Sequence, residues 1–184
     1  MSIKVLALSG SLRKKSFNSA LLREAQKLAP AGMTIEIGDY STFPLYNEDV
    51  REQGFPPAVQ KLRDQIKAAD ALLFSIAEYN FSVSGVLKNA IDWASRPPDQ
   101  PFDQKPFALM GAAGGPIGTG RAQYHLRQMM VFLNAFALNK PEVFVGAAHT
   151  KFDADLNLTD AVAKDLIGQL LKNLVTWTER VRAK

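Results

Sequence analysis

The sequence predicts an α/β fold in which a five-stranded parallel sheet is covered by helices on both faces. Short apolar runs alternate with amphipathic segments along the chain, and these segments are long enough for the right-handed crossovers that join parallel strands. A chain of 184 residues with 47% hydrophobic content suits one compact unit. We therefore expect residues 1–184 to form a single domain, a three-layer sandwich with strand order 2-1-3-4-5.

Five apolar runs have the length and composition of buried strands. Each is short and rich in aliphatic or aromatic residues, and helical or irregular patterns separate one run from the next. The run at 33–37 is the weakest of the five. The predicted strands cover residues 3–9, 33–37, 71–76, 107–112 and 141–145.

Five further segments have the period of amphipathic helices. In the first of them, Leu21, Leu22 and Ala25 fall on one face, and the second begins with Pro57, a residue favoured in the first helical turn. The predicted helices cover residues 18–29, 57–68, 84–95, 121–132 and 158–180. The stretches 39–55, 96–106 and 147–157 have no regular pattern, and long loops of this kind are usually functional or covered by a partner.

The composition restricts the chemistry. The chain has no cysteine, so any redox chemistry needs a bound cofactor. Its net charge of +4 comes from dispersed lysines and arginines, which favours a solvated surface over nucleic-acid binding. No stretch reaches the length of a membrane span, and the N-terminus lacks a signal-peptide pattern. We expect a cytoplasmic protein with no nucleic-acid partner, no membrane insertion and, because His125 and His149 stand alone, no bound metal.

The loop after the first strand has the donors of a phosphate site. In a sheet of this order the ligand crevice lies at the carboxyl ends of the strands. Ser11, Ser16 and Asn18 offer short polar groups there, Arg13 can bridge phosphate oxygens, and the following helix begins with unpaired N–H groups. The alternative is a helix cap at Ser16 or Asn18 with solvated basic residues around it.

Several segments together resemble the NAD(P)H-dependent FMN reductase family, which includes bacterial quinone and chromate reductases of flavodoxin-like fold. The resemblance extends over nearly the whole chain. Its segments are GSLRK at 10–14, EYN at 78–80, LKNAIDW at 87–93, GGPIG at 114–118 and RAQYHLR at 121–127.

This resemblance implies an FMN site with its phosphate in the loop 11–18, the flavin ring against 77–80 and a second wall at 112–118. The implied cofactor contacts are Ser11, Arg13, Ser16, Phe17, Asn18, Ala77, Glu78, Tyr79, Asn80, Ala112, Gly114 and Gly115. Contacts to the electron donor or acceptor are expected at Tyr79, Arg96 and Ile117. We expect no catalytic side chain, because N5 of the flavin performs the redox step.

Some of these residues have a structural alternative. Tyr79 can pack within its loop, Asn80 can make turn bonds, and Arg96 can be a solvated residue at a helix end. Asn89 and Trp93 are interpreted as structural residues that anchor the flavin loop or a subunit contact. The chain also departs from the family at Ala77 and Ser84, where many relatives have proline, and at Ala112, where a hydroxyl residue is frequent.

The function implied by the resemblance is two-electron transfer from NADPH or NADH to quinones in a ping-pong cycle, with azo compounds, nitro compounds and chromate as further acceptors. The first alternative is a flavodoxin-type electron carrier, although flavodoxins are typically acidic and this chain is basic. A second is a receiver-type signalling module, which needs acidic residues that are missing after the first and third strands. The family also implies a homodimer or homotetramer.

Overall fold

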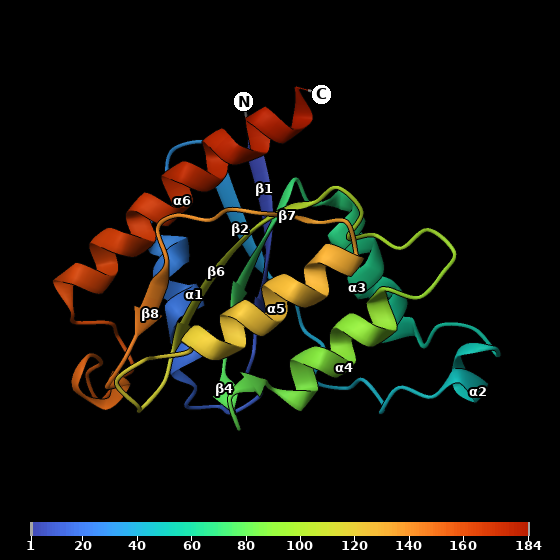
Figure 1. Cartoon of the computed structure of the whole chain (residues 1–184), viewed down its shortest axis with the longest axis horizontal. Coiled ribbons are helices and arrows are strands. Elements are labelled where there is room, and N and C mark those ends of the chain that lie inside the picture. The colour runs from blue at the N-terminus through green and yellow to red at the C-terminus, as the bar shows by residue number, and fades with distance from the viewer. Residues whose placement is uncertain (1, 184) are drawn as a thin grey trace.

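The structure, a computed structural model, describes residues 2–183 and has a parallel sheet at its centre (Figure 1). The strand order is β2-β1-β3-β6-β7, and β8 pairs with β6 next to β7. Every neighbouring pair in this sheet is parallel. Its strands are β1 (Ile3–Ser9), β2 (Met33–Ile37), β3 (Ala71–Ser75), β6 (Pro106–Ala112), β7 (Phe136–Ala137) and β8 (Val143–Val145).

The predicted order is confirmed, but two short strands share the fifth position. The strand β7, which the sequence analysis missed, pairs with Pro106 and Phe107, whereas β8 pairs with the end of β6 from Met110 onward. The strand expected at 141–145 begins at Val143, two residues later than predicted. Pro141 has no N–H group to donate to a ladder, which explains why no continuous strand runs through this position.

Helices cover both faces of the sheet (Figure 1). On one face lie α1 (Phe17–Lys27) and α6 (Ala161–Arg182), and on the other lie α3 (Pro57–Ala68), α4 (Gly85–Ala94) and α5 (Gly120–Phe132). The alternation of side chains along each strand divides the core between these layers. In β1, Val5 and Ala7 pack toward α1 and α6, while Leu6 and Leu8 pack toward α3.

Short helices and strands occur in the stretches for which the sequence shows no regular pattern. The segment 39–55 contains the one-turn helix α2 (Glu48–Arg51), and the segment 147–157 contains a 3₁₀ turn, Ala148–Thr150. After β3 the chain forms a hairpin of β4 (Glu78–Tyr79) and β5 (Ser82–Val83), which the sequence analysis did not predict. Among residues 2–183, no helix combines the length and apolarity needed to cross a membrane.

Candidate functional site

Three loops meet where β1, β3 and β6 end. We call them the β1 loop (residues 10–16), the β3 hairpin (78–83) and the β6 loop (113–119). The β1 loop lies directly against the chain that leaves β3, because the Gly10 N–H donates to Ser75 O at 2.6 Å. A Cβ atom at Gly10 would lie 2.4 Å from the Ala77 nitrogen, so this close approach requires glycine.

The β1 loop combines unpaired N–H groups with cations. Arg13, Lys14 and Lys15 form no ion pair with any carboxylate among residues 2–183. Within the same residues, the backbone N–H groups of Leu12, Lys14, Lys15 and Phe17 donate to no protein acceptor. Such a donor set, at the start of α1, fits a phosphate group.

Two predicted phosphate ligands have structural duties. The Ser16 hydroxyl accepts from the N–H groups of Asn18 and Ser19, both at 3.2 Å. Ser16 therefore caps α1, which was the alternative to a phosphate contact. The Asn18 amide is buried and pairs with both backbone groups of Ala112, at 3.0 Å and 2.9 Å. It also accepts from the Ser75 hydroxyl at 3.1 Å, so Asn18 joins α1 to the ends of β3 and β6.

Hydroxyl groups hold the carbonyl oxygens at the start of the β1 loop. The Tyr40 hydroxyl donates to Ser9 O, and the Ser84 hydroxyl donates to Gly10 O at 2.6 Å. Burial raises the pKa of Tyr40, so its hydroxyl stays protonated and can act as a donor. Tyr40 was not predicted from the sequence because it follows β2 within an irregular stretch and belongs to no motif.

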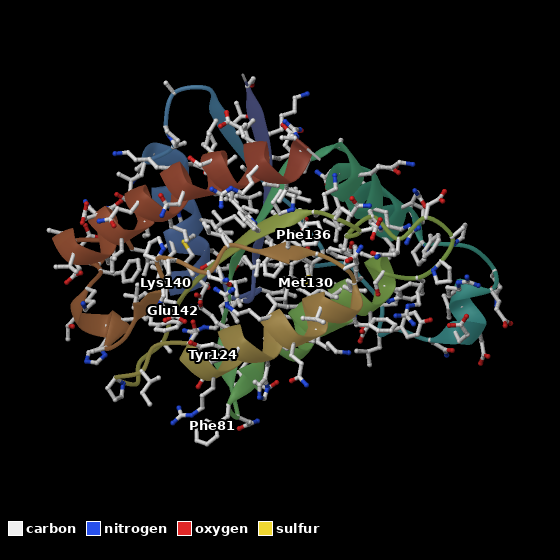
Figure 2. All side chains as sticks on the ribbon, turned by 45° about the horizontal axis from the view of Figure 1, so that its top comes forward. Phe81, Tyr124, Met130, Phe136, Lys140 and Glu142 are labelled. Atoms are coloured by element: carbon white, nitrogen blue, oxygen red, sulfur yellow. The ribbon has the colours of Figure 1, made fainter. Side chains whose placement is uncertain are left out.

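The β3 hairpin presents aromatic side chains to solvent. Asn80 and Phe81 form its turn with φ values of 51° and 63°, the left-handed pair of a type I′ turn. Ala77 is buried below the hairpin, whereas Tyr79 is 51% and Phe81 63% exposed. Figure 2 shows Phe81 projecting from the molecule at this tip. Asn80 therefore forms part of a turn, which is the structural role that the sequence left open beside a cofactor contact.

Glu78 fixes the hairpin to α5. Its carboxylate accepts from the Ala122 N–H at 3.0 Å, in the first turn of a helix whose preceding residue, Thr119, provides no side-chain cap. Arg121 Nη1 lies 3.6 Å from the same carboxylate, and its guanidinium carbon lies 4.1 Å from the centre of the Phe81 ring. Because these bonds occupy the Glu78 side chain, its backbone is what remains to contact a ligand.

A cleft of about 640 Å³ separates the β3 hairpin from the β6 loop. Glycine dominates its second wall, and Gly118 has a φ of 65°, which favours glycine. Residues lining the cleft are Glu78, Asn80, Phe81, Ala113, Gly114, Gly115, Pro116, Ile117, Gly118 and Arg121. A larger hollow of about 890 Å³ lies between α3 and the strands β1 and β2, but none of the three loops lines it. The cleft of about 640 Å³ is thus lined by two of the three loops, the β3 hairpin and the β6 loop.

The structure does not bring Arg96 to this cleft. Arg96 follows the C-terminal end of α4, while the hairpin precedes its N-terminal end, and a ten-residue helix is about 15 Å long. Its guanidinium donates to Asp92 O and the Ser95 hydroxyl and lies 5.5 Å from the Tyr46 ring centre. The expectation that Arg96 lies next to the crevice is therefore corrected.

Asn89 and Trp93 anchor a different loop from the one expected. Asn89 Nδ2 and Trp93 Nε1 both donate to Pro44 O at 2.9 Å, and Asn89 Oδ1 accepts from the Tyr46 N–H at 2.8 Å. The rings of Tyr46 and Trp93 pack edge to face with centres 4.9 Å apart. Both residues are structural, as expected, but they hold the segment 39–55 rather than the flavin loop.

Comparison with known proteins agrees with this geometry. Residues 3–150 match the family model for NADPH-dependent FMN reductases. The chain is 60% identical over 180 residues to an NAD(P)H-dependent FMN reductase of Pseudomonas aeruginosa, covering 98% of this chain and 97% of the relative. It is 49% identical to an NADPH:quinone oxidoreductase of Arabidopsis thaliana, with 99% and 95% covered.

Solved structures give the same result. The flavoenzyme FerB of Paracoccus denitrificans, an NAD(P)H:acceptor oxidoreductase, superposes with a TM-score of 0.87 at 33% identity. That match covers 97% of this chain and 98% of FerB. An NADH:FMN oxidoreductase in its apo form has a TM-score of 0.71 at 16% identity, which supports the fold alone.

Proposed function

The chain belongs to the NADPH-dependent FMN reductase family, and from this membership we propose that its three loops bind FMN and that it reduces quinones with NADPH or NADH. It is an FMN-dependent oxidoreductase, in agreement with the main interpretation and not with the electron-carrier alternative. Bound FMN supplies a centre at N5 that accepts a hydride and passes two electrons onward. The protein residues bind and orient FMN, the nicotinamide nucleotide and the quinone.

The observation that carries the proposal is the donor set of the β1 loop. The N–H groups without a protein acceptor and the cations Arg13, Lys14 and Lys15 offer neutralisation and hydrogen bonds to a dianionic phosphate. Ser11, which is buried, holds the turn by accepting from the Arg13 N–H at 3.3 Å. Ser16 and Asn18 contribute by fixing this loop, and Phe17 contributes its N–H group.

The cleft between the β3 hairpin and the β6 loop suits a flat ring. Gly114 and Gly115 have nothing within 4 Å of a Cβ position, so a planar group can approach their backbone closely. Ile117 lines the cleft and is exposed, and Tyr79 is exposed on the adjoining strand of the β3 hairpin, so both can offer apolar contact to a nicotinamide or quinone. Both substrates would use this cleft in turn, which accounts for a ping-pong cycle.

The open form of the cleft supports several acceptors. We place quinones first, because relatives carry that activity in their names, and we extend the range to azo compounds, nitro compounds and chromate. The cytoplasm is the proposed location, since reduced pyridine nucleotides are supplied there. All three loops belong to one sheet, which supports a single functional domain.

A homodimer or homotetramer is the proposed assembly. Along α5, Val131 is 76% and Phe132 87% exposed, which is unusual for large apolar side chains on a helix. Tyr124 on the same helix donates to Glu142 within one chain at 2.6 Å, and Lys140 pairs with the same carboxylate group (Figure 2). Because Tyr124 and Glu142 already bond to each other within one chain, Val131 and Phe132 are better candidates than this pair for a subunit contact.

The visible absorption spectrum of the purified protein tests the proposed function. FMN should add its bands on binding, NADPH without oxygen should bleach them, and benzoquinone should restore them. Bands that NADPH does not bleach would favour a flavodoxin-type carrier. Failure to bind added FMN would contradict the assignment of the site.

A further inference from the structure

Three consecutive carbonyl groups at the start of the β1 loop are each bound by a hydroxyl group. Ser9 O accepts from Tyr40, Gly10 O from Ser84 at 2.6 Å, and Ser11 O from the Ser9 hydroxyl at 3.1 Å. Tyr40 and Ser84 are 4% and 1% exposed. They come from separate parts of the chain, the turn after β2 and the start of α4, and neither belongs to the predicted cofactor contacts.

The direction of these carbonyl groups matters for an anion. A carbonyl oxygen carries partial negative charge and repels phosphate, whereas an N–H group attracts it. In a trans peptide unit the C=O and the following N–H point in opposite directions. The Ser11 carbonyl is held by Ser9, so the Leu12 N–H points away from that bond, and it has no acceptor among residues 2–183.

We propose, on the basis of the FMN site above, that Tyr40 and Ser84 are positioning residues for the FMN phosphate. Their hydroxyls hold the carbonyl oxygens of Ser9 and Gly10 away from the anion. The N–H groups that follow these two carbonyls, those of Gly10 and Ser11, donate to Ser75 O and to the Ser9 hydroxyl, so the N–H groups from Leu12 onward are the ones left to face the anion. Neither side chain needs to touch the phosphate itself.

Ser84 gives this arrangement a second consequence. Its hydroxyl also accepts from the Leu87 N–H at 3.4 Å and so begins α4 directly after the β3 hairpin. The bond to Gly10 O therefore ties the hairpin, which lines the ring cleft, to the β1 loop. This contact would fix the separation between the segments that would hold the phosphate and the ring of one FMN molecule.

The substitution Tyr40→Phe isolates the effect, because it removes one hydroxyl and keeps the ring that packs against Phe43. We would measure the affinities for FMN and for riboflavin, which lacks the phosphate, by quenching of flavin fluorescence. The Kd for FMN should rise about three- to tenfold, the typical effect of one hydrogen bond, and that for riboflavin by less than about twofold. The phosphorus resonance of bound FMN should also shift.

Tyr46→Phe is the matched control, because it removes a tyrosine hydroxyl that bonds to Glu48 away from the β1 loop. Both affinities should stay unchanged in this variant. Ser84→Ala is the second test, in which FMN affinity should again fall more than riboflavin affinity.

Equal losses of FMN and riboflavin affinity in both test variants would assign Tyr40 and Ser84 a general packing role and overturn the proposal. Unchanged affinities would also overturn it, while leaving the FMN site intact. A wild-type protein that binds neither flavin would contradict the proposed function, and this inference with it. The wild-type titration thus distinguishes the two failures.

Discussion

At the scale of single residues, Arg13 is the side chain whose proposed contact with the FMN phosphate is most directly tested. Its guanidinium has no carboxylate partner among residues 2–183 and can bond two phosphate oxygens. Arg13→Ala should weaken FMN binding by roughly 1.5–3 kcal/mol, the range for hydrogen bonds to charged groups. Equilibrium titration measures this loss, with Arg23→Ala as a control that removes an exposed arginine from α1. Equal FMN affinity in the two variants would refute the assignment.

Asn18 contributes to stability by a different route. Asn18→Ala leaves three buried groups without their partner, the two backbone groups of Ala112 and the Ser75 hydroxyl. We expect a loss of about 1–3 kcal/mol in the free energy of unfolding, measured by urea denaturation. Asn18→Asp keeps an acceptor but loses the donor to Ala112 O, so it should also be destabilised. A wild-type midpoint in both variants would show that these bonds contribute nothing.

Residue identity alone indicated part of this site. Ser16 was recognisable as a possible helix cap because a cap acts on N–H groups two and three residues further along the chain. The role of Arg13 as a phosphate ligand stays a prediction. Tyr40 and Ser84 act on carbonyl groups 31 and 74 residues away in sequence, and no local pattern records such contacts. Arg96 was misplaced for a different reason, because the predicted helix at 84–95 already separates it from the hairpin by about 15 Å along the helix axis.

At the scale of elements, the approach of β6 to its neighbours requires glycine. A Cβ atom at Gly111 would lie 2.0 Å from Thr119 Oγ1 and 2.6 Å from Ile76 O. Gly111→Ala should lower the free energy of unfolding by about 1–3 kcal/mol through overpacking. Gly114→Ala is the matched control, because nothing lies within 4 Å of its Cβ position. Equal melting temperatures for the two variants would contradict this account.

The N-terminus of α6 gives a pH-dependent contribution to stability. Hydrogen bonds from the Ala163 N–H and from Lys151 lower the pKa of Asp160 below its ordinary value. A carboxyl with a lowered folded-state pKa stabilises the protein above its unfolded value of about 3.9 and loses this effect as the pH falls further.

Asp160→Ala should therefore cost about 1 kcal/mol at pH 7, the usual value of a helix cap, and progressively less below about pH 4. Urea denaturation of both proteins across this range measures the difference. Asp165→Ala is the control. The Asp165 carboxylate lies on the same helix but accepts from the Gln169 side chain and caps no backbone N–H group, so the effect of its removal should depend less on pH. A difference between wild type and Asp160→Ala that is constant from pH 7 to pH 3 would disprove the mechanism.

The elements that periodicity could predict are those that bury a continuous face. The helix at 57–68 and the strand at 3–9 have the predicted bounds, and both bury most of the side chains that their patterns place toward the core. The strands β4, β5 and β7 were missed because two residues cannot show a period. Their pairing depends on contacts made elsewhere in the fold, such as the bond from Glu78 to α5.

At the scale of the whole molecule, topology accounts for the location of the site. The β1 loop and the β6 loop are separated by about a hundred residues in sequence, yet both lie at the carboxyl ends of parallel strands. This rule allowed the three loops to be grouped from sequence alone. It does not describe surfaces formed by neighbouring helices. The sequence indicated surplus apolar residues at 124–136, and the structure adds that Val131 and Phe132 are the exposed ones at the end of α5.

That exposed end provides the test of assembly. Phe132 is 87% exposed beside Val131, and a charge at this position would oppose burial against a second chain. Phe132→Glu should shift the mass in light scattering toward the monomer at micromolar concentration, while the melting temperature changes little because the side chain is outside the core. Val162→Glu is the control, since Val162 is also exposed but lies on α6 at the opposite face of the sheet. A monomeric wild type would refute the proposed assembly, and a Phe132→Glu variant with the wild-type oligomeric mass would move the contact to another surface.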